Sequence, residues 1–345
     1  MRPSHANRYL PLLLTSLLLA TLAWPYAAIQ NKADNTEIRI VPAPGMVTID
    51  GDLKDWDLSG EIFMFIDEAS KATHHLRGAM MYDRDALYVS GRLKDQTPMV
   101  NQYAFGGEVN MAWNADALQL FLVANPEVRS AALTMTGARM PAEEQQYVNY
   151  LTLWYSTKDQ QAGYHAFYTL DFKDATLNPE GVKGVWVKDA DGQGCVFEYR
   201  IPWAVLRMPR PPQGGEAIQM LWQLHWGNDL GTELKSGIND VRNPTSNALG
   251  YMGPGGWGLG RFMAQGHLPP RPSALAARAH GHIPVNFTLA QPAKVSLAIR
   301  DAAGQTVRTG LGAMPYPAGD HTWLWDGLDD RDRPLPAGAY TAVIL

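Results

Sequence analysis

The sequence predicts an all-β protein: an antiparallel β-sandwich followed by a second, smaller all-β unit. Apolar and polar residues alternate with a period of two in many short segments, as in half-buried strands. Turn-forming sequences such as Asp-Gly and Pro-Ala-Gly separate these segments, and 32 Gly and 24 Pro suit many short turns. The sequence has no long amphipathic helical repeat that could connect parallel strands. These observations favour a sandwich over an α/β fold.

The first 28 residues have the organisation of an export signal. Arg2 and Arg8 precede an apolar run over 10–23, and small residues follow at Ala27 and Ala28. The run is shorter than the roughly 20 residues that span a bilayer, which favours a cleaved signal peptide over 1–28; a retained anchor is the alternative. We therefore expect a bacterial protein that is secreted, periplasmic or at the cell surface, with no membrane span after cleavage.

Composition restricts the partners. The net charge is −5 and the sequence has no basic stripe, so nucleic acid is not an expected partner. A length of 345 residues with 46% hydrophobic content allows two domains and a large core. The single cysteine, Cys195, excludes an intrachain disulfide and is expected to be a small core residue.

Strands are expected where alternation or a short apolar run lies between turn signals. The series begins at 38–41, and Asp50-Gly51 then makes a turn that leads Trp56 onto the core. A short helical turn is expected near 141–146. The further strands expected in the first unit are 86–93, 117–122, 147–155, 164–172, 184–187, 195–201 and 218–226.

The strand over 218–226 has the clearest division between its two faces. Ile218, Trp222 and Trp226 share one face, whereas Gln223 and His225 share the other. The apolar face is expected to cover the core, and the polar face is expected to point away from it.

The stretch 113–122 predicts a binding site. Its second half is apolar except for Gln119, as in a strand buried on both faces, and Trp113 and Asp116 stand just before it. An aromatic ring beside fixed polar groups suits a sugar ring: the aromatic covers the C–H face, and amides or carboxylates bond the hydroxyls. Plain packing of Trp113 is the alternative.

A Pro- and Ala-rich linker over 266–283 divides the chain. Before it lies a first unit over 43–265, which a linker and first strand over 29–42 precede. After it lies a second unit over 284–345, where alternation begins again and Asp-Gly and Pro-Ala-Gly turns separate the strands. The sequence therefore predicts two folding units.

Several short motifs occur in a fixed order along the first unit, over roughly 41–262. They are Ile49-Asp50-Gly51, Trp56, the strand 85–89 with Lys94-Asp95, Trp113 with Asp116, Glu198 with Ile201-Pro202-Trp203, and Trp257-Gly258. In this order they resemble the family 9 carbohydrate-binding modules and their DOMON-like relatives. The resemblance implies a β-sandwich whose partner is a poly- or oligosaccharide, although other relatives of this fold bind haem.

The resemblance also implies the residues that bind the sugar. Sugar-binding members hold a terminal sugar between two aromatics and fix it with polar groups. Gln119 stands where the family has a carboxylate, and this weakens its bonds to hydroxyls because charge-assisted hydrogen bonds are stronger. The implied contacts are Trp113 and either Tyr251 or Trp257 as aromatics, with Gln119, Gln223 and Asn247 as polar groups.

The second unit resembles the immunoglobulin-like domain of the flagellar hook-capping protein, which also occurs in many secreted bacterial proteins. The matching residues are 301–304, Val307-Arg308, 317–319, His321, 325–327, Asp329 and 336–340. The resemblance implies an immunoglobulin-like sandwich that serves as a spacer or docks other envelope or secreted proteins. It does not imply a flagellar role.

Metal and haem hypotheses rest on fewer residues. Asp189 and Asp191 loosely resemble a calcium loop but lack the glutamate that completes an EF-hand, so a hairpin turn is favoured over structural calcium. The sequence contains no Cys-x-x-Cys-His motif, which excludes covalent haem. Noncovalent haem held by a Met and a His or Lys is the alternative, although no pair is singled out, and no other cofactor is expected.

Catalysis is not expected, because the sequence has no marked carboxylate pair and no nucleophile-elbow, Walker or zincin motif. The sequence thus predicts an exported, non-catalytic carbohydrate-binding protein. The alternatives are a structural or surface-display protein that binds no sugar and a periplasmic haem-binding subunit.

Overall fold

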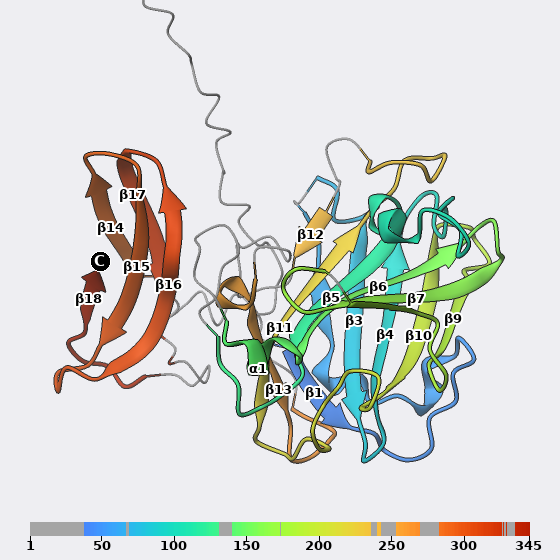
Figure 1. Ribbon diagram of the computed structural model, residues 1–345, viewed down its shortest axis with the longest axis horizontal. Helices are drawn as coiled ribbons and strands as arrows, with labels where there is room; N and C mark the ends of the chain where they lie inside the picture. The colour runs from blue at the N-terminus through green and yellow to red at the C-terminus, as the bar shows by residue number, and fades with distance from the viewer. Residues whose placement is uncertain are drawn as a thin grey trace, which may run out of the picture.

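The computed structural model describes residues 38–66, 69–130, 140–172, 174–235, 240–242, 253–269, 283–325, 327, 329 and 335–345. Regular structure in these residues is nearly all β, which confirms the predicted fold class (Figure 1). The strands of the first unit are β1 (Ile38–Pro42), β2 (Ile62–Met64), β3 (His75–Tyr82), β4 (Ala86–Lys94), β5 (Ala117–Val123), β6 (Val148–Ser156), β7 (Gln161–Tyr168), β8 (Asp174–Leu177), β9 (Lys183–Lys188), β10 (Gly194–Pro202), β11 (Ala217–His225), β12 (Asp240–Arg242) and β13 (Gly258–Phe262).

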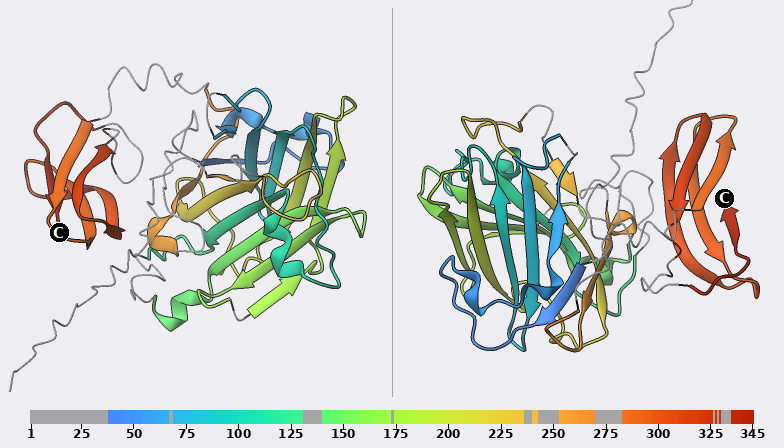
Figure 2. Two further views of the ribbon diagram at one scale, coloured as in Figure 1. Left: turned by 90° about the horizontal axis from the view of Figure 1, so that it is seen from above. Right: turned by 180° about the vertical axis from the view of Figure 1, so that it is seen from behind.

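These strands form one 13-stranded sheet with the order β8-β7-β6-β5-β11-β13-β1-β3-β4-β10-β9. Outside this path, β12 pairs with β11 and β2 pairs with β3. β7 lies close to β9, although the two strands are near opposite ends of the path. The sheet therefore curls onto itself and gives the two layers visible in Figures 1 and 2.

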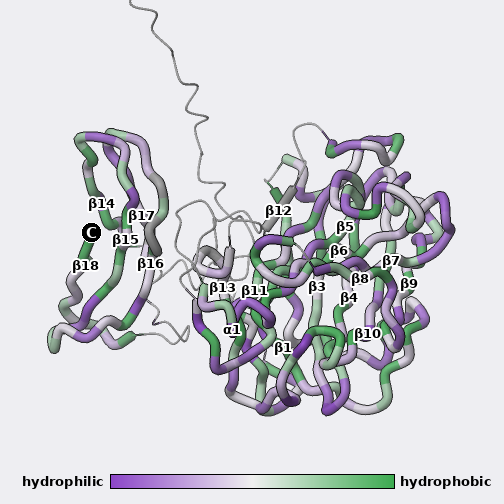
Figure 3. Tube along the Cα trace, in the orientation of Figure 1, coloured by the Kyte–Doolittle hydropathy of each residue, from purple (hydrophilic) through white to green (hydrophobic). Residues whose placement is uncertain are grey.

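One large apolar cluster fills the space between the layers. The predicted faces of β11 are confirmed, because Ile218, Trp222 and Trp226 belong to this cluster. Leu221, which shares a face with Gln223 and His225, belongs to a separate cluster. Apolar residues lie mainly along the strands, as Figure 3 shows. The other predicted core residues, namely Trp56, Trp203 and Cys195, are also buried.

β1 departs from the predicted antiparallel pattern. It pairs parallel to β13 on one side and parallel to β3 on the other. The strand therefore belongs to the sandwich sheet, and the first unit includes residues from Ile38 onward rather than from 43. Ile38 and Ile40 are buried in the main cluster and Val41 in a separate one, as expected for a strand that is covered on both faces.

Glu198 has a structural role that explains its place among the sequence motifs. Its carboxylate accepts hydrogen bonds from the backbone N–H groups of Asp50 and Gly51, at 2.8 and 3.0 Å. Gly51 has a φ of 89°, a left-handed conformation that glycine adopts without a Cβ clash. The Asp50-Gly51 turn is thus fixed to β10 by a buried side chain.

The second unit has the predicted small β-fold. Its strands are β14 (Ile283–Leu289), β15 (Ala293–Arg300), β16 (Thr306–Tyr316), β17 (Gly319–Trp325) and β18 (Thr341–Ile344). β14 pairs with β17, and the order β16-β15-β18 forms a second sheet. Among the described residues of this unit, Leu297, Ile299 and Trp325 form a buried apolar cluster, and Val295 is also buried.

Over the described residues, the chain contains no helix with the length and hydropathy needed to cross a membrane.

Candidate functional site

Four polar residues lie side by side across the sheet, on the face that points away from the main core. Gln223 on β11 is paired with Gln119 on β5, Gln119 with Thr152 on β6, and Thr152 with His165 on β7. Directly paired residues of antiparallel strands project to the same side of a sheet. We call Gln223, Gln119, Thr152 and His165 the polar row. β12 extends the register by one strand, where Arg242 is paired with Gln223.

The polar row separates two apolar clusters on the same face. One cluster lies two residues before Gln119 along β5. It contains Ala117 and Trp154, packed against Ala112 of the 3-10 helix η3 (Val109–Asn114). The other cluster begins two residues after Gln119 along β5, at Phe121. Its other members are Val123, Val128, Met140, Val148, Tyr150, Leu221 and Trp257. Hydrogen-bonding groups among apolar side chains are the composition expected of a ligand site.

Trp113 stands at the β11 side of the row. It belongs to η3, is half-buried, and its ring centroid lies 6.0 Å from that of His225 at an angle of 59°. His225 is paired with Ala117, so it is the neighbour of the row toward η3. The indole is therefore partly open to solvent and packs against the imidazole next to the row, which is an arrangement expected for an aromatic that contacts a sugar.

Gln119 connects three strands through its amide. Its Nε2 donates to Thr152 Oγ1 at 3.2 Å, and its Oε1 lies 3.0 Å from His225 Nε2. Gln119 is half-buried, whereas Thr152, Gln223 and His225 are at most 6% exposed. Within the polar row, Gln119 is therefore the residue whose side chain is most open to a ligand.

His165 ends the row on β7 in an apolar environment. It is buried and packs edge-on against Phe167, with ring centroids 4.7 Å apart. Burial lowers the pKa of His165 below its usual value, because the charged imidazolium loses hydration. The row thus presents an imidazole that is neutral at pH 7.

Asp116 does not face the site, contrary to its expected place beside Trp113. It is 2% exposed, and its two oxygens accept hydrogen bonds from the backbone N–H groups of Gly227 and Val100, at 2.6 and 2.9 Å. Burial and the nearby Asp95 carboxylate raise the pKa of Asp116. The side chain therefore ties loops to the entrance of β5.

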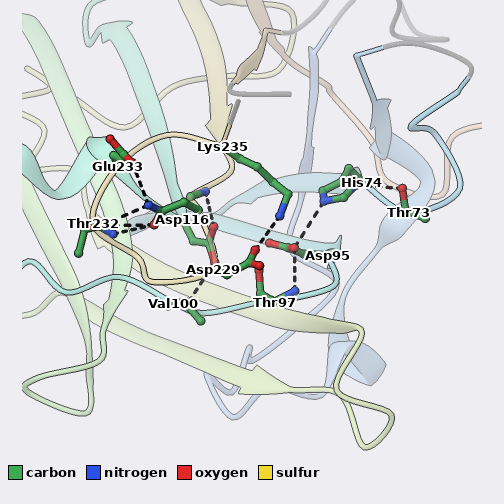
Figure 4. A network of polar contacts seen from close by, with 12 residues as sticks. Thr73, His74, Asp95, Thr97, Val100, Asp116, Asp229, Thr232, Glu233 and Lys235 are labelled. Carbon is green, nitrogen blue, oxygen red and sulfur yellow. Dashed lines mark hydrogen bonds and ion pairs between the residues drawn. The ribbon is translucent and has the colours of Figure 1, made fainter. Parts of the chain in front are cut away.

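Asp95 belongs to the same buried network, which Figure 4 shows from close by. Its Oδ1 accepts a hydrogen bond from the Thr97 N–H at 2.9 Å and lies 3.7 Å from His74 Nε2. Lys235 in turn contacts Asp229 at 2.8 Å. These contacts lie in the loops that precede β3 and follow β4 and β11.

The remaining predicted site residues have different outcomes. Asn247 and Tyr251 lie outside the described residues. Trp257 is 7% exposed and packs against Phe121 and Tyr150, with centroids 5.9 and 5.7 Å apart. Trp257 thus belongs to the apolar cluster beside the polar row. Its role as the second aromatic contact with the sugar stays a prediction.

Asp189 and Asp191 form the hairpin turn between β9 and β10. The Asp191 carboxylate accepts the Gln193 N–H at 2.8 Å and lies 3.5 Å from Lys94 Nζ. In the described part of the chain, no group of three His, Cys, Asp or Glu side chains is arranged to hold a metal ion. Structural calcium at this turn stays a prediction.

Sequence reasoning missed Thr152, His165 and the exposed aromatic Phe172. Phe172 is 39% exposed, has a φ of 57°, and lies 4.5 Å from Tyr150 between ring centroids. Thr152 and His165 were not identifiable from local patterns, because only the pairing of β5, β6 and β7 brings them beside Gln119.

The second unit matches a known family. Residues 274–344 match the FlgD Ig-like domain, which confirms the predicted type of the second unit. No curated protein sequence matches this chain.

Solved structures match this chain at low identity. One is a family 9 carbohydrate-binding module from Caldicellulosiruptor kristjanssonii in complex with glucose; it is 15% identical, covers 68% of this chain and 100% of its own, and has a TM-score of 0.42. The same module in complex with cellotriose is 16% identical with equal coverage and a TM-score of 0.41. The cytochrome domain of cellobiose dehydrogenase from Myriococcum thermophilum is 9% identical, covers 57% of this chain and 85% of its own, and has a TM-score of 0.26.

Proposed function

We propose that the first unit is a non-catalytic carbohydrate-binding module that holds a saccharide against Trp113 and the polar row. The observation that carries the proposal is the half-buried indole of Trp113, which contacts His225 beside a cross-strand row of amide, hydroxyl and imidazole groups. A pyranose ring offers an apolar C–H face and hydroxyls at its rim. The indole suits the apolar C–H face, and the polar row suits the hydroxyls.

The described part of the site is suited to binding rather than to bond cleavage. The row has no carboxylate, and the nearby Asp116 is sealed by two backbone hydrogen bonds. Glycoside hydrolysis needs two carboxyl groups on either side of the scissile bond. The geometry therefore supports recognition of a glycan, and the catalytic machinery of any polysaccharide-degrading system would belong to another domain or protein.

A binding assay with a matched variant tests the proposal. Isothermal titration of the full chain uses glucose and cellotriose first, followed by pull-down on insoluble polysaccharides. Trp113→Ala is expected to weaken binding at least about tenfold, the effect of losing roughly 1.4 kcal/mol. Trp323→Ala removes another half-buried indole, in the immunoglobulin-like unit, and is expected to bind like the unaltered protein.

The alternatives predict different results. A protein that only displays or docks partners would bind no member of a broad glycan panel, and that outcome would refute the sugar proposal. A haem-binding subunit would show a Soret band after purification with haem. We further propose export to the periplasm, cell surface or medium, which detection of the mature protein outside the cytoplasm would support.

A further inference from the structure

His225 lies where the aromatic part of the site meets the amide part. Its ring contacts Trp113, and its Nε2 lies 3.0 Å from Gln119 Oε1. The residue is 2% exposed, so the protein environment holds it in place. It therefore has the geometry to set how the half-buried Gln119 amide is presented.

The hydrogen bonds have a direction. With Gln119 Nε2 donating to Thr152 Oγ1, its Oε1 must accept from His225, which requires the proton to be on His225 Nε2. An amide turned by 180° would instead take the Thr152 hydroxyl proton and donate to an unprotonated His225 Nε2. The protonation of one imidazole nitrogen thus decides which way Gln119 points.

We propose that His225 is a positioning residue that fixes Gln119 as a hydrogen-bond donor, so that the site holds its saccharide through an acceptor oxygen of the sugar. This inference rests on the proposed function. An amide nitrogen carries two hydrogens, and Thr152 takes one of them. The second remains for the ligand, and a hydroxyl or ring oxygen of the sugar is the matching partner.

Three variants and one spectrum test this role, with cellotriose as the probe. His225→Phe keeps a ring against Trp113 but cannot donate to Gln119, and it is expected to raise the cellotriose Kd about tenfold. His225→Gln places an N–H near the former Nε2 and is expected to recover binding to within about threefold of the unaltered protein. Gln119→Glu is nearly isosteric but cannot donate, and it is expected to weaken binding. Nitrogen chemical shifts of the ring should show the Nε2–H tautomer.

The results that would overturn the inference are distinct. Unchanged affinity in His225→Phe, tighter binding in Gln119→Glu, or the Nδ1–H tautomer would each contradict it. If His225→Phe does not fold, then Gln119→Glu and the spectrum decide. Loss of cellotriose binding in Trp113→Ala combined with tighter binding in Gln119→Glu would contradict this inference and leave the proposed function supported. Absence of glycan binding by the unaltered protein would remove the proposed function and this inference with it.

Discussion

The hydroxyl of Tyr199 joins the two ends of the curled sheet, and replacing Tyr199 with Phe should measure what that junction contributes. Tyr199 is on β10 and 1% exposed. Its oxygen accepts the Trp186 Nε1–H at 2.8 Å, and its proton faces the carbonyl oxygens of Gly163 and Trp154 at 2.8 and 3.2 Å. Burial raises the pKa of Tyr199, so the hydroxyl is a neutral donor at every working pH. Gly163 and Trp154 belong to the strands that carry His165 and Thr152.

The magnitude follows from the bonds that Phe cannot make. A hydroxyl has one proton, so one accepted and one donated hydrogen bond are lost, each with a net value of about 1 kcal/mol. The Trp186 N–H would stay buried without this partner, which adds a desolvation cost of about 1 kcal/mol at the lower limit. We expect a total loss of about 2–3 kcal/mol. For a domain of this size that corresponds to a lowering of Tm by roughly 4–12 °C.

Differential scanning calorimetry of the full chain measures the effect in the transition of the first unit. Tyr103→Phe is the matched control, because the Tyr103 hydroxyl also donates to a carbonyl, that of Thr232 at 2.7 Å, and accepts the Asn114 Nδ2–H at 3.0 Å, but near the surface. Water can replace those bonds, so the control should lose less than about 1 kcal/mol. Equal losses in the two variants would refute the reasoning that burial at the junction sets the value.

Two further predictions concern the same sheet. Burial lowers the pKa of His165 in the folded chain. Below about pH 6.5 the unfolded chain therefore binds a proton at this residue more readily than the folded chain does. The free energy of unfolding consequently falls as the pH drops through this range. His165→Gln should lose less stability between pH 7 and pH 5 in urea unfolding, and an identical pH dependence would contradict the assignment. Gly78→Ala would place a Cβ 2.5 Å from Trp222 Cζ3, so it should cost about 1–3 kcal/mol, whereas Gly45→Ala, with no atom within 4 Å, should be nearly neutral by the same measurement.

Local patterns were sufficient for most of the first unit. Alternation located β4, β10 and β11 to within one residue at each end, because their faces differ strongly in polarity. β3 (His75–Tyr82) escaped prediction because both of its faces are largely buried: Leu76 and Met80 join the main core, and Ala79 and Met81 a separate cluster. A strand buried on both faces has no period for a sequence to show.

The site was predictable only in part, and for a related reason. Trp113 and Gln119 stand close together in the sequence, and Gln223 was identified through a family resemblance. Thr152 and His165 come from strands that reach Gln119 only by pairing, so their contribution depends on register, which no local pattern encodes. The expectation that the Asp116 carboxylate faces the site was wrong, because a carboxylate next to an aromatic in the sequence can equally be a buried acceptor for backbone N–H groups.

The hydrogen bonds of Asp116 also keep its carboxyl group out of the described part of the site. A buried carboxylate costs free energy unless hydrogen bonds compensate it, and here two backbone N–H groups do so. A carboxylate at position 119, next to buried Thr152 and Gln223, would lose part of its hydration. Glutamine at 119 avoids that cost and keeps a side chain that spans from His225 to Thr152. The same choice exchanges a charge-assisted acceptor for a neutral donor. Gln119→Glu therefore tests the stability of the entrance to β5 together with the chemistry of the ligand.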